Sequence, residues 1–301
     1  MLIAVIVTYH PDLAQLRILL QALLPQIGAA VVVDNGSSQD ISAWAQAEFA
    51  QALHVISLGE NKGIAAAQNI GIDWAQARQA AGMILFDQDS RPATDMVAQL
   101  WQAYGELQQQ GRAVAALGPQ ICDEHSGASM AFQQRDGWCE KSCYCQAGEV
   151  LPVESVIASG CLIPAAALSE IGKMRADFFI DYVDMEWCLR AKQMGFQVFA
   201  VCGAKLFHHL GEARHQFGDR KIPVHRPIRY YYMARNRTYL YCHQNLPLAW
   251  KVMDAFRLLR KYAFYSLFTA PRRQNWLAMT RGIWDGVCGH LGPIPEKYKP
   301  T

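Results

Sequence analysis

The 301-residue sequence contains no apolar run approaching the ~20 residues that a membrane-spanning helix needs. It also lacks low-complexity tracts and internal repeats, and 51% hydrophobic with 18% charged residues is typical of a folded globular protein. The first apolar run, Leu2–Thr8, has neither the basic leader nor the cleavage site of an export signal. We therefore expect a cytoplasmic protein with one large domain and an appendage, or two small domains.

The nine cysteines show no paired framework. In a reducing cytoplasm such residues are expected to be free thiols rather than disulfides. Cys139, Cys143 and Cys145 lie close together and could bind zinc, but two of their intervals differ from those of a paired C-x-x-C site. Loop thiols are the default interpretation for these three residues.

The chain also lacks a strong net charge. The total of +2 is the sum of an acidic first part and a basic last part. Up to Cys202 there are 11 Lys and Arg residues against 21 Asp and Glu, and from Gly203 onward there are 17 against 5. The basic half indicates an anionic partner, and the alternative is a basic face that keeps the protein soluble. No nucleic-acid-binding motif is present, and the acidic first two-thirds of the chain disfavours a nucleic acid as that partner.

Short apolar runs alternate with helical patterns in the first third of the chain, which predicts an α/β fold with a mostly parallel sheet flanked by helices. Asp12 is expected to cap the first helix and a second helix is expected over 64–81. From Gly118 to Val153 the composition indicates loops and short strands, and a further helix is predicted over 184–194. The expected strands are Leu2–Thr8, Ala30–Val33, Leu53–Ser57, Gly82–Phe86, Val156–Pro164 and Gln197–Val201.

Polar residues follow the first four predicted strands, where the carboxyl ends of parallel strands form one edge of a sheet. Any single group is compatible with a solvated turn, but four such groups together predict a ligand site. The four groups are Thr8 with Tyr9, Asp34 with Asn35, Asn61 to Gly63, and Asp87 to Asp89.

Asp87 and Asp89 flank one residue directly after an apolar strand. In extended geometry residues i and i+2 point the same way, so the two carboxylates are expected to share one face. Oxygen ligands of this kind suit Mg²⁺ or Mn²⁺ bridging to phosphate. The alternative is a pair of turn carboxylates, with Asp89 or Ser90 capping a helix that begins near Pro92.

Two later groups also carry charged side chains. Asp184 lies at the start of a predicted helix among aromatic residues, where a general base for a sugar hydroxyl would be useful, while Glu186 and Arg190 have the spacing of a surface ion pair. His208 and His209 follow a strand end and favour a metal or phosphate role. Beyond them, arginines and tyrosines alternate, as suits phosphate binding and ring stacking.

Taken in order, these residues resemble the inverting family 2 glycosyltransferases of the GT-A fold, and most closely bacterial rhamnosyltransferases of O-antigen and other surface polysaccharides. The match covers about residues 1–240. It is carried by the stretches VIVTYHP (5–11), VVVDNGS (31–37), ENKGIAAAQNIG (60–71), ILFDQDS (84–90), FFIDYVDMEWCLR (178–190) and YYYMARN (230–236).

The resemblance implies a role for each matching residue. The general base is expected at Asp184, where the family usually has a Glu-Asp pair and this chain has Val183-Asp184, so Asp181 or Glu186 could share its work. Donor contacts are expected from Thr8, Tyr9, Asp34, Asn35, Asn61, Gly63, Asn69, Asp87 and Gln88. Ligands of Mg²⁺ or Mn²⁺ are expected to be Asp89, Asp87 and His208. Acceptor-side support is expected from Gly160, Asp181, Tyr182, Glu186 and Arg190. Phosphate contacts are expected from Arg235 and Asn236.

The resemblance further implies a nucleotide-sugar donor, most simply dTDP-L-rhamnose, and a saccharide acceptor linked to polyprenyl diphosphate at the cytoplasmic face of the inner membrane. A catalytic domain is expected over 1–245, with a donor half over about 1–117 and an acceptor half over about 118–245. A helical extension is expected over 246–301. In Trp250–Phe268 a polar stripe (Lys251, Asp254, Arg257, Lys261) opposes an apolar one (Trp250, Met253, Phe256, Phe264, Leu267), which suits either a membrane interface or packing on the catalytic domain.

Four alternatives to this assignment stay open. A UDP- or GDP-sugar would keep the fold and the mechanism with a different donor. A nucleotidyltransferase or a dehydrogenase would need a glycine-rich phosphate loop, which Thr8–Pro11 is not. A non-catalytic scaffold that binds sugar nucleotides would not need Asp87, Asp89 and Asp184, all of which are present.

Overall fold

The computed structural model describes all residues except 124–126, 147, 209–213, 218–219 and 297–301. Packing divides the chain into two compact units. The first, here called the sheet unit, comprises Met1–Met174 and Asp184–Leu210. The second, the helical unit, comprises Arg175–Val183 and Gly211–Thr301. The predicted division into a catalytic domain over 1–245 and an extension over 246–301 concerns function and stays a prediction.

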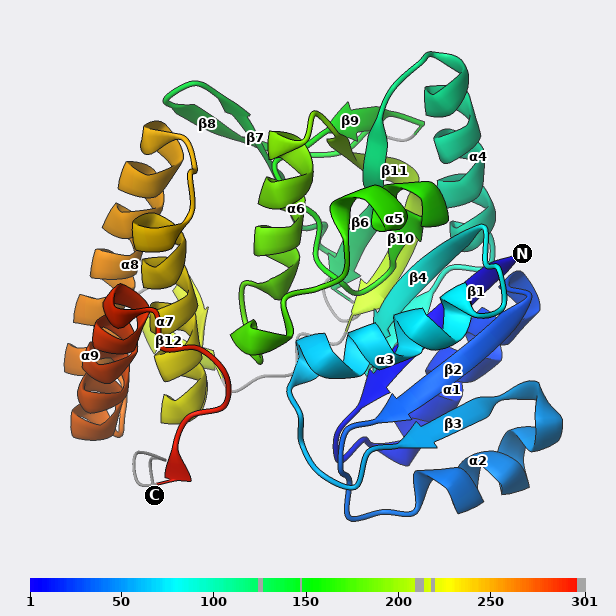
Figure 1. Cartoon of the computed structure of the whole chain (residues 1–301), viewed down its shortest axis with the longest axis horizontal. Helices are drawn as coiled ribbons and strands as arrows, with labels where there is room; N and C mark the ends of the chain where they lie inside the picture. The colour runs from blue at the N-terminus through cyan, green and yellow to red at the C-terminus, as the bar shows by residue number, and fades with distance from the viewer. Residues whose placement is uncertain (124–126, 147, 209–213, 218–219, 297–301) are drawn as a thin grey trace. The chain divides into compact units, whose positions relative to one another are not determined.

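A mixed nine-stranded sheet forms the centre of the sheet unit within the described ranges, in the order β3-β2-β1-β4-β10-β6-β11-β5, with β9 beside β11 (Figure 1). The strands are β1 (Leu2–Thr8), β2 (Ala29–Asp34), β3 (His54–Ser57), β4 (Gly82–Asp87), β5 (Ser90–Pro92), β6 (Val114–Asp123), β9 (Val150–Pro152), β10 (Cys161–Pro164) and β11 (Gln197–His208). The neighbours β3, β2, β1 and β4 are parallel, β6 pairs parallel with β11, and β10, β5 and β9 pair antiparallel with their neighbours. The predicted mostly parallel α/β sheet is confirmed.

Apolar side chains bury both faces of this sheet, as the continuous apolar run of β1 predicts. Ala4 and Ile6 join a core with helices α1 (Leu13–Leu23), α2 (Ile41–Phe49) and α4 (Met96–Gln109). Helices α3 (Ile64–Gln76) and α5 (Ala165–Ile171) pack on the sheet from its other face (Figure 1). Gly71 lets α3 lie directly on β1, because a Cβ there would come within 2.2 Å of Val5 Cγ1. The ends of β1, β2 and β4 therefore extend from strands that are almost completely buried.

Several element boundaries differ from those the sequence predicts. Helix α3 ends at Gln76 instead of Ala81, because a turn follows in which Gln79 adopts a positive φ of 54°. Strand β6 extends to Asp123, into the region predicted to carry loops and short strands, and β10 begins only at Cys161. Ser90 lies in β5 rather than capping a helix, since α4 begins at Met96.

The cysteine prediction is wrong for two of the nine residues. Cys145 and Cys202 form a disulfide that joins the loop after β8 (Cys139–Cys143) to β11, across 57 residues of sequence. The other seven cysteines are free thiols. The bond also removes Cys145 from the triplet considered for zinc.

The helical unit contains α7 (Pro227–His243), α8 (Leu248–Leu267) and α9 (Arg272–Cys288), together with a hairpin of β12 (Arg214–Phe217) and β13 (Arg220–Pro223). Helices α7 and α9 approach closely because α9 carries two glycines four residues apart. A Cβ on Gly282 would meet the Tyr231 carbonyl oxygen at 2.4 Å, and one on Gly286 would meet that of Arg235 at 2.5 Å. No helix in the described part of the chain is both long and apolar enough to cross a membrane.

A buried ion pair ties α7 to α8. Arg237 donates to both carboxylate oxygens of Asp254, at 2.9 and 2.7 Å, and the hydroxyls of Tyr182 and Tyr241 donate to the same carboxylate. Both charged residues are almost fully buried. The sequence places Asp254 on a polar surface stripe of α8, and this is wrong, because its partners require it to face inward.

Candidate active site

The carboxyl ends of four adjacent strands lie in register at one edge of the sheet. Thr8 of β1 is level with Asp34 of β2, Val7 is level with Asp87 of β4, and Asp34 is level with Ser57 of β3. The polar groups predicted at these strand ends are thus brought to one edge, which is the usual place for a ligand in a sheet of this kind.

Asp34 organises the loop after β2. Its carboxylate accepts hydrogen bonds from the Thr8 hydroxyl at 3.0 Å and from the backbone N–H and hydroxyl of Ser37, while the Ser37 hydroxyl accepts from the His10 N–H at 2.8 Å. Thr8 and Asp34 are both buried. These contacts join the first two strand ends, and the base contact expected of Asp34 stays a prediction.

A second set of contacts joins the loops after β2 and β3. The Asn35 amide donates to Asn61 Oδ1 at 3.1 Å and accepts from the Lys62 N–H at 2.9 Å, and Asn61 Oδ1 also accepts from the Gly63 N–H. Gly63, with φ of 86°, precedes the first residue of α3. The side chains of Asn35 and Asn61 therefore hold the N-terminus of α3 at the same edge of the sheet.

Gln88 connects the first strand end to the Asp87–Asp89 turn. Its Oε1 accepts from the Tyr9 N–H at 2.8 Å and its Nε2 donates to the Tyr9 carbonyl at 3.3 Å. The Tyr9 side chain is exposed to solvent. The four polar groups thus form one hydrogen-bonded rim rather than four separate turns.

Ser159, which the sequence did not single out, supports this turn together with Ser90. Buried Ser159 donates to the Ser90 hydroxyl at 3.0 Å, and its oxygen lies 3.4 Å from the Asp87 backbone nitrogen. Gly160 follows with φ of 77°, and a Cβ there would meet Pro119 at 2.6 Å. Only glycine fits this position, so the support role expected of Gly160 has a steric basis.

Asp87 and Asp89 provide two carboxylate ligands for a divalent cation. Both are partly exposed, and Gln88 and Asp89 form a turn, so the extended geometry assumed from the sequence does not hold between them. The last residue of β11, His208, is level with Ser90 and Asp123, although its side chain lies outside the described residues. Within the described ranges no three His, Cys, Asp or Glu residues form a metal cluster. Two carboxylates still fit Mg²⁺ or Mn²⁺, because such ions take further ligands from substrate phosphates and water.

Asn69 is placed differently from the other expected donor ligands. It lies in the middle of α3, where its amide donates to the Met174 carbonyl at 2.8 Å and accepts from the Met174 N–H at 3.0 Å. Both ends of this amide are therefore occupied by backbone. The structure gives Asn69 the role of an anchor for Met174.

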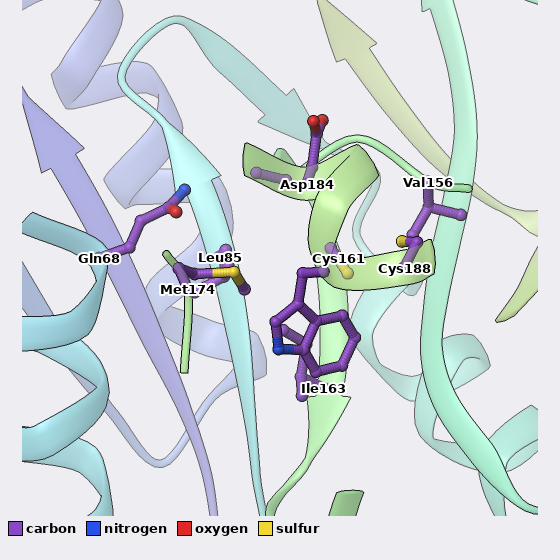
Figure 2. A pocket seen from close by; sticks show the side chains of 10 residues that line it. Gln68, Leu85, Val156, Cys161, Ile163, Met174, Asp184 and Cys188 are labelled. Atoms are coloured by element: carbon purple, nitrogen blue, oxygen red, sulfur yellow. The ribbon is translucent and has the colours of Figure 1, made fainter. Parts of the chain in front are cut away.

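Asp184 lies in the first turn of α6 (Val183–Gln193), at the rim of a small pocket (Figure 2). Its Oδ1 accepts from the Met185 N–H at 2.8 Å, and Asp184 is the single acidic residue of the lining. The remaining lining is mostly apolar and comes from α3, β4, β10, α6 and the connecting segments before β10 and after α5: Gln68, Leu85, Val156, Ala158, Cys161, Ile163, Met174, Trp187 and Cys188.

Two thiols in this pocket are poor nucleophiles. Burial raises the pKa of Cys161 well above its ordinary value, and burial raises the pKa of Cys188 to about 12. Both thiols stay protonated at neutral pH, which leaves Asp184 as the proton acceptor among the lining residues. Gln68 is also buried, and its Oε1 has no hydrogen-bond partner among the described residues, so it is available to a ligand donor group.

Glu186 and Arg190 have a structural role in the sheet unit. Both carboxylate oxygens of Glu186 accept from Arg190 at 3.0 Å, and Arg190 also donates to the carbonyls of Ile171 and Lys173. Glu186 is 2% exposed. A carboxylate held in this way is unsuited to accept an acceptor proton, which favours Asp184 as the base.

The segment just before Asp184 is strained. Phe179, Asp181 and Tyr182 each adopt a φ of 64°, in the region that side chains other than glycine avoid. Asp181 pairs with Arg229 at 3.2 Å, and burial raises the pKa of its carboxyl against the opposing pull of that guanidinium. Three residues with a positive φ within four positions need stabilising contacts from another part of the chain.

Arg235 and Asn236 of α7 supply that support. The Asn236 amide nitrogen lies within 3.0 Å of the carbonyl oxygens of Phe178, Ile180 and Asp181, and Arg235 donates to the carbonyls of Asp177, Phe178 and Gly292. Both side chains are fully buried. This burial argues against the phosphate contact expected from the sequence and shows instead a clamp on the strained segment.

Replacement of Asn236 by Ala is expected to lower the free energy of unfolding by ~1–3 kcal/mol, because buried carbonyl groups lose their donor. Thermal unfolding of purified variants measures this as a drop of several degrees. The matched control is Gln109→Ala on the exposed side of α4, which should leave the melting temperature unchanged. An unaltered melting temperature for the Asn236 variant would contradict the clamp.

Comparison with solved structures identifies the fold. The structure of S. aureus TarS residues 1–349 in complex with UDP-GlcNAc superposes with a TM-score of 0.59 at 14% identity, over 99% of this chain and 82% of that one. The structure of GalNAc-T7 with UDP, GalNAc and Mn²⁺ gives a TM-score of 0.58 at 14% identity, over 87% of this chain and 54% of that one, so this chain spans about half its length. At these identities the likeness shows the fold alone, and that fold is GT-A.

Sequence comparison then gives the family. Residues 4–133 match the model of "Glycosyl transferase family 2". The chain is also 32% identical over 295 residues to the dTDP-rhamnosyl transferase RfbF of Shigella flexneri, covering 96% of both chains. The chain therefore belongs to glycosyl transferase family 2, as its motifs predict.

Proposed function

We propose that this enzyme transfers L-rhamnose from dTDP-L-rhamnose to a saccharide acceptor in the synthesis of O-antigen or another surface polysaccharide. The observation that carries the proposal is the full-length similarity to a dTDP-rhamnosyl transferase, at 32% identity over 96% of the chain. The rim at the strand ends supplies a place for the nucleotide, and Asp184 supplies a base near the sugar.

Asp184 removes the proton of the acceptor hydroxyl as its oxygen attacks the anomeric carbon of rhamnose. The bond from that carbon to the diphosphate breaks in the same step, dTDP departs with its electron pair, and the anomeric centre inverts. The position of Asp184 at a largely apolar pocket suits this role, because fewer waters compete for its carboxylate.

Asp87 and Asp89 would hold Mg²⁺ or Mn²⁺, which stabilises the charge developing on the departing diphosphate. Gln88, between them, ties their turn to Tyr9. The donor diphosphate is thereby placed at the edge of the sheet formed by β1, β2 and β4, with its nucleotide toward Thr8 and Asp34.

The pocket below Asp184 supports a deoxy sugar as donor. Its lining of Val156, Ile163, Met174 and Trp187 offers apolar contact to the C6 methyl group that distinguishes rhamnose from common hexoses. Gln68 Oε1 is available to a sugar hydroxyl.

The acceptor is proposed to be a saccharide on polyprenyl diphosphate, which places the enzyme at the cytoplasmic face of the inner membrane. The basic last third of the chain, with 17 Lys and Arg residues against 5 Asp and Glu from Gly203, suits an anionic lipid surface and an anionic carrier.

Thermal stability of the purified protein against a panel of sugar nucleotides tests the donor. We expect a rise of several degrees with dTDP-L-rhamnose and Mn²⁺ or Mg²⁺, since a ligand that binds only the folded state stabilises it. UDP- and GDP-sugars at the same concentration, and dTDP-L-rhamnose with a chelator, are the controls. A comparable rise with a UDP- or GDP-sugar alone would discard rhamnose while keeping the fold and the mechanism.

A further inference from the structure

The outer side of α8 is apolar. Leu248, Val252, Phe256, Leu259 and Leu267 recur at helical spacing, and each is 47–67% exposed. The buried stripe on the opposite side of α8 consists of Trp250, Asp254, Leu258 and Tyr265. The apolar stripe predicted from the sequence is divided in the structure. Trp250 is buried and Phe264 packs with the apolar residues of α7 and α9, whereas Phe256 and Leu267 are exposed. The exposed apolar face therefore contains two residues of the predicted stripe together with Leu248, Val252 and Leu259.

Helix α9 continues this surface. Its buried stripe faces α7 and includes Met279, Gly282 and Asp285, while its outer side exposes Trp276, Leu277, Trp284 and Val287. Helices α8 and α9 pack against one another within the helical unit (Figure 1). We call these nine residues, five from α8 and four from α9, the outer face. Large side chains such as two tryptophans are seldom left exposed together without a partner.

Basic residues accompany the outer face, and surface acids are scarce around it. Residues 246–296 contain seven Lys and Arg against three Asp and Glu. Two of the three acids, Asp254 and Asp285, are buried in hydrogen-bonded contacts with α7, whereas Arg260, Arg272 and Arg273 are exposed. The surface of α8 and α9 is thus apolar with a cationic surround.

We propose that the outer face of α8 and α9 inserts into the interface of an anionic lipid bilayer. Exposed Leu, Phe and Trp side chains suit the boundary between headgroups and acyl chains, and nearby arginines suit anionic headgroups. A second copy of the chain fits less well, because a two-fold contact would bring the arginines of both copies together. The inference rests on the proposed function for its setting, since a lipid-linked acceptor brings the enzyme to a membrane.

Co-sedimentation of the full chain with vesicles tests this surface directly. With vesicles of phosphatidylcholine and phosphatidylglycerol we expect binding that is weaker at 1 M salt and much weaker with phosphatidylcholine alone. The double variant F256S/L259S should lose at least ~10-fold in partitioning, because two large apolar side chains would no longer be transferred from water into lipid. A second double variant, W276S/W284S, should lose as much.

The matched control is Q108S/Q109S, which changes two exposed residues of α4 and should bind vesicles like the unaltered protein. Equal binding by F256S/L259S and the unaltered protein would overturn the proposal, as would absence of binding to anionic vesicles. Sedimentation equilibrium measures whether the chain forms a dimer. A dimer that is lost in F256S/L259S would show that a second copy covers the outer face, and would overturn the membrane assignment.

Donor-induced stabilisation of the same variants separates this inference from the proposed function. F256S/L259S should keep the full thermal shift with dTDP-L-rhamnose and metal, because the altered residues are exposed and lie outside the candidate active site. Loss of vesicle binding with a normal donor shift supports the surface. Normal vesicle binding by a protein that no donor stabilises would instead count against the proposed function alone.

Discussion

Asp184→Asn should lower turnover by at least ~100-fold while leaving the affinity for dTDP-L-rhamnose nearly intact. Asparagine has almost the same shape, and its Oδ1 can still accept the Met185 N–H that Asp184 accepts at 2.8 Å. What it cannot do is take the proton of the acceptor hydroxyl, and a lost general base costs about 10²–10⁴-fold in rate. The variant should therefore show an effect on kcat with little change in donor binding.

Release of dTDP in the presence of acceptor measures turnover, and calorimetry measures donor affinity. Glu186→Gln is the matched control, because it removes a neighbouring carboxylate of α6 whose two oxygens are already bound by Arg190. We expect that control to lose stability but to keep turnover within a few-fold. If Asp184→Asn turns over normally and Glu186→Gln does not, the base is Glu186.

Asp89→Ala should abolish the part of donor binding that depends on metal. Asp89 is partly exposed in the turn between β4 and β5, so its removal is expected to leave the fold intact. Without this carboxylate the ion keeps too few protein ligands to bridge to the diphosphate. We expect the thermal shift with dTDP-L-rhamnose and Mn²⁺ to fall to the value seen with a chelator.

Asp95→Ala controls for this variant, since Asp95 is an exposed carboxylate six residues away whose contact is to Gln99. It should retain the full shift. A metal-dependent shift that survives in Asp89→Ala would show that the ion is held elsewhere, and would remove the argument for the Asp87–Asp89 turn.

The sheet was largely predictable because strands that are buried on both faces have continuous apolar sequences. The predicted strand Leu2–Thr8 and the predicted helix cap at Asp12 are both confirmed, the strand with the same bounds. Strand β6 was harder, because Gly118 and Pro119 in its middle are typical of loops. Gly118 is nevertheless required there, since a Cβ would come within 2.6 Å of Val156, and this neighbour is distant in sequence.

The rim of the candidate site was predictable for a similar reason, because carboxyl ends of parallel strands must meet at one edge. The roles of Arg235 and Asn236 could not be predicted. Alternating basic and aromatic residues form the same sequence pattern whether their side chains bind a phosphate or buried backbone carbonyls. Their partners are carbonyl groups more than fifty residues away. The disulfide between Cys145 and Cys202 escaped prediction in the same way.

Helix α8 shows the limit of periodicity most clearly. Its sequence has two apolar sides, around Trp250 and around Leu259, and the helical pattern does not say which one packs. The buried pair of Arg237 and Asp254 decides the question, because the charge of Asp254 must face its partner on α7. Leu259 is consequently left at the surface.

Transfer of labelled rhamnose tests the account most directly. The purified protein would be incubated with Mn²⁺, dTDP-L-[¹⁴C]rhamnose and polyprenyl-diphosphate-linked saccharides extracted from cells that make a rhamnose-containing polysaccharide, with Asp184→Asn in parallel. The account predicts label in the lipid-soluble product with the unaltered protein and at least ~100-fold less with the variant. Donor binding without label in any product, or equal labelling by both proteins, would contradict it.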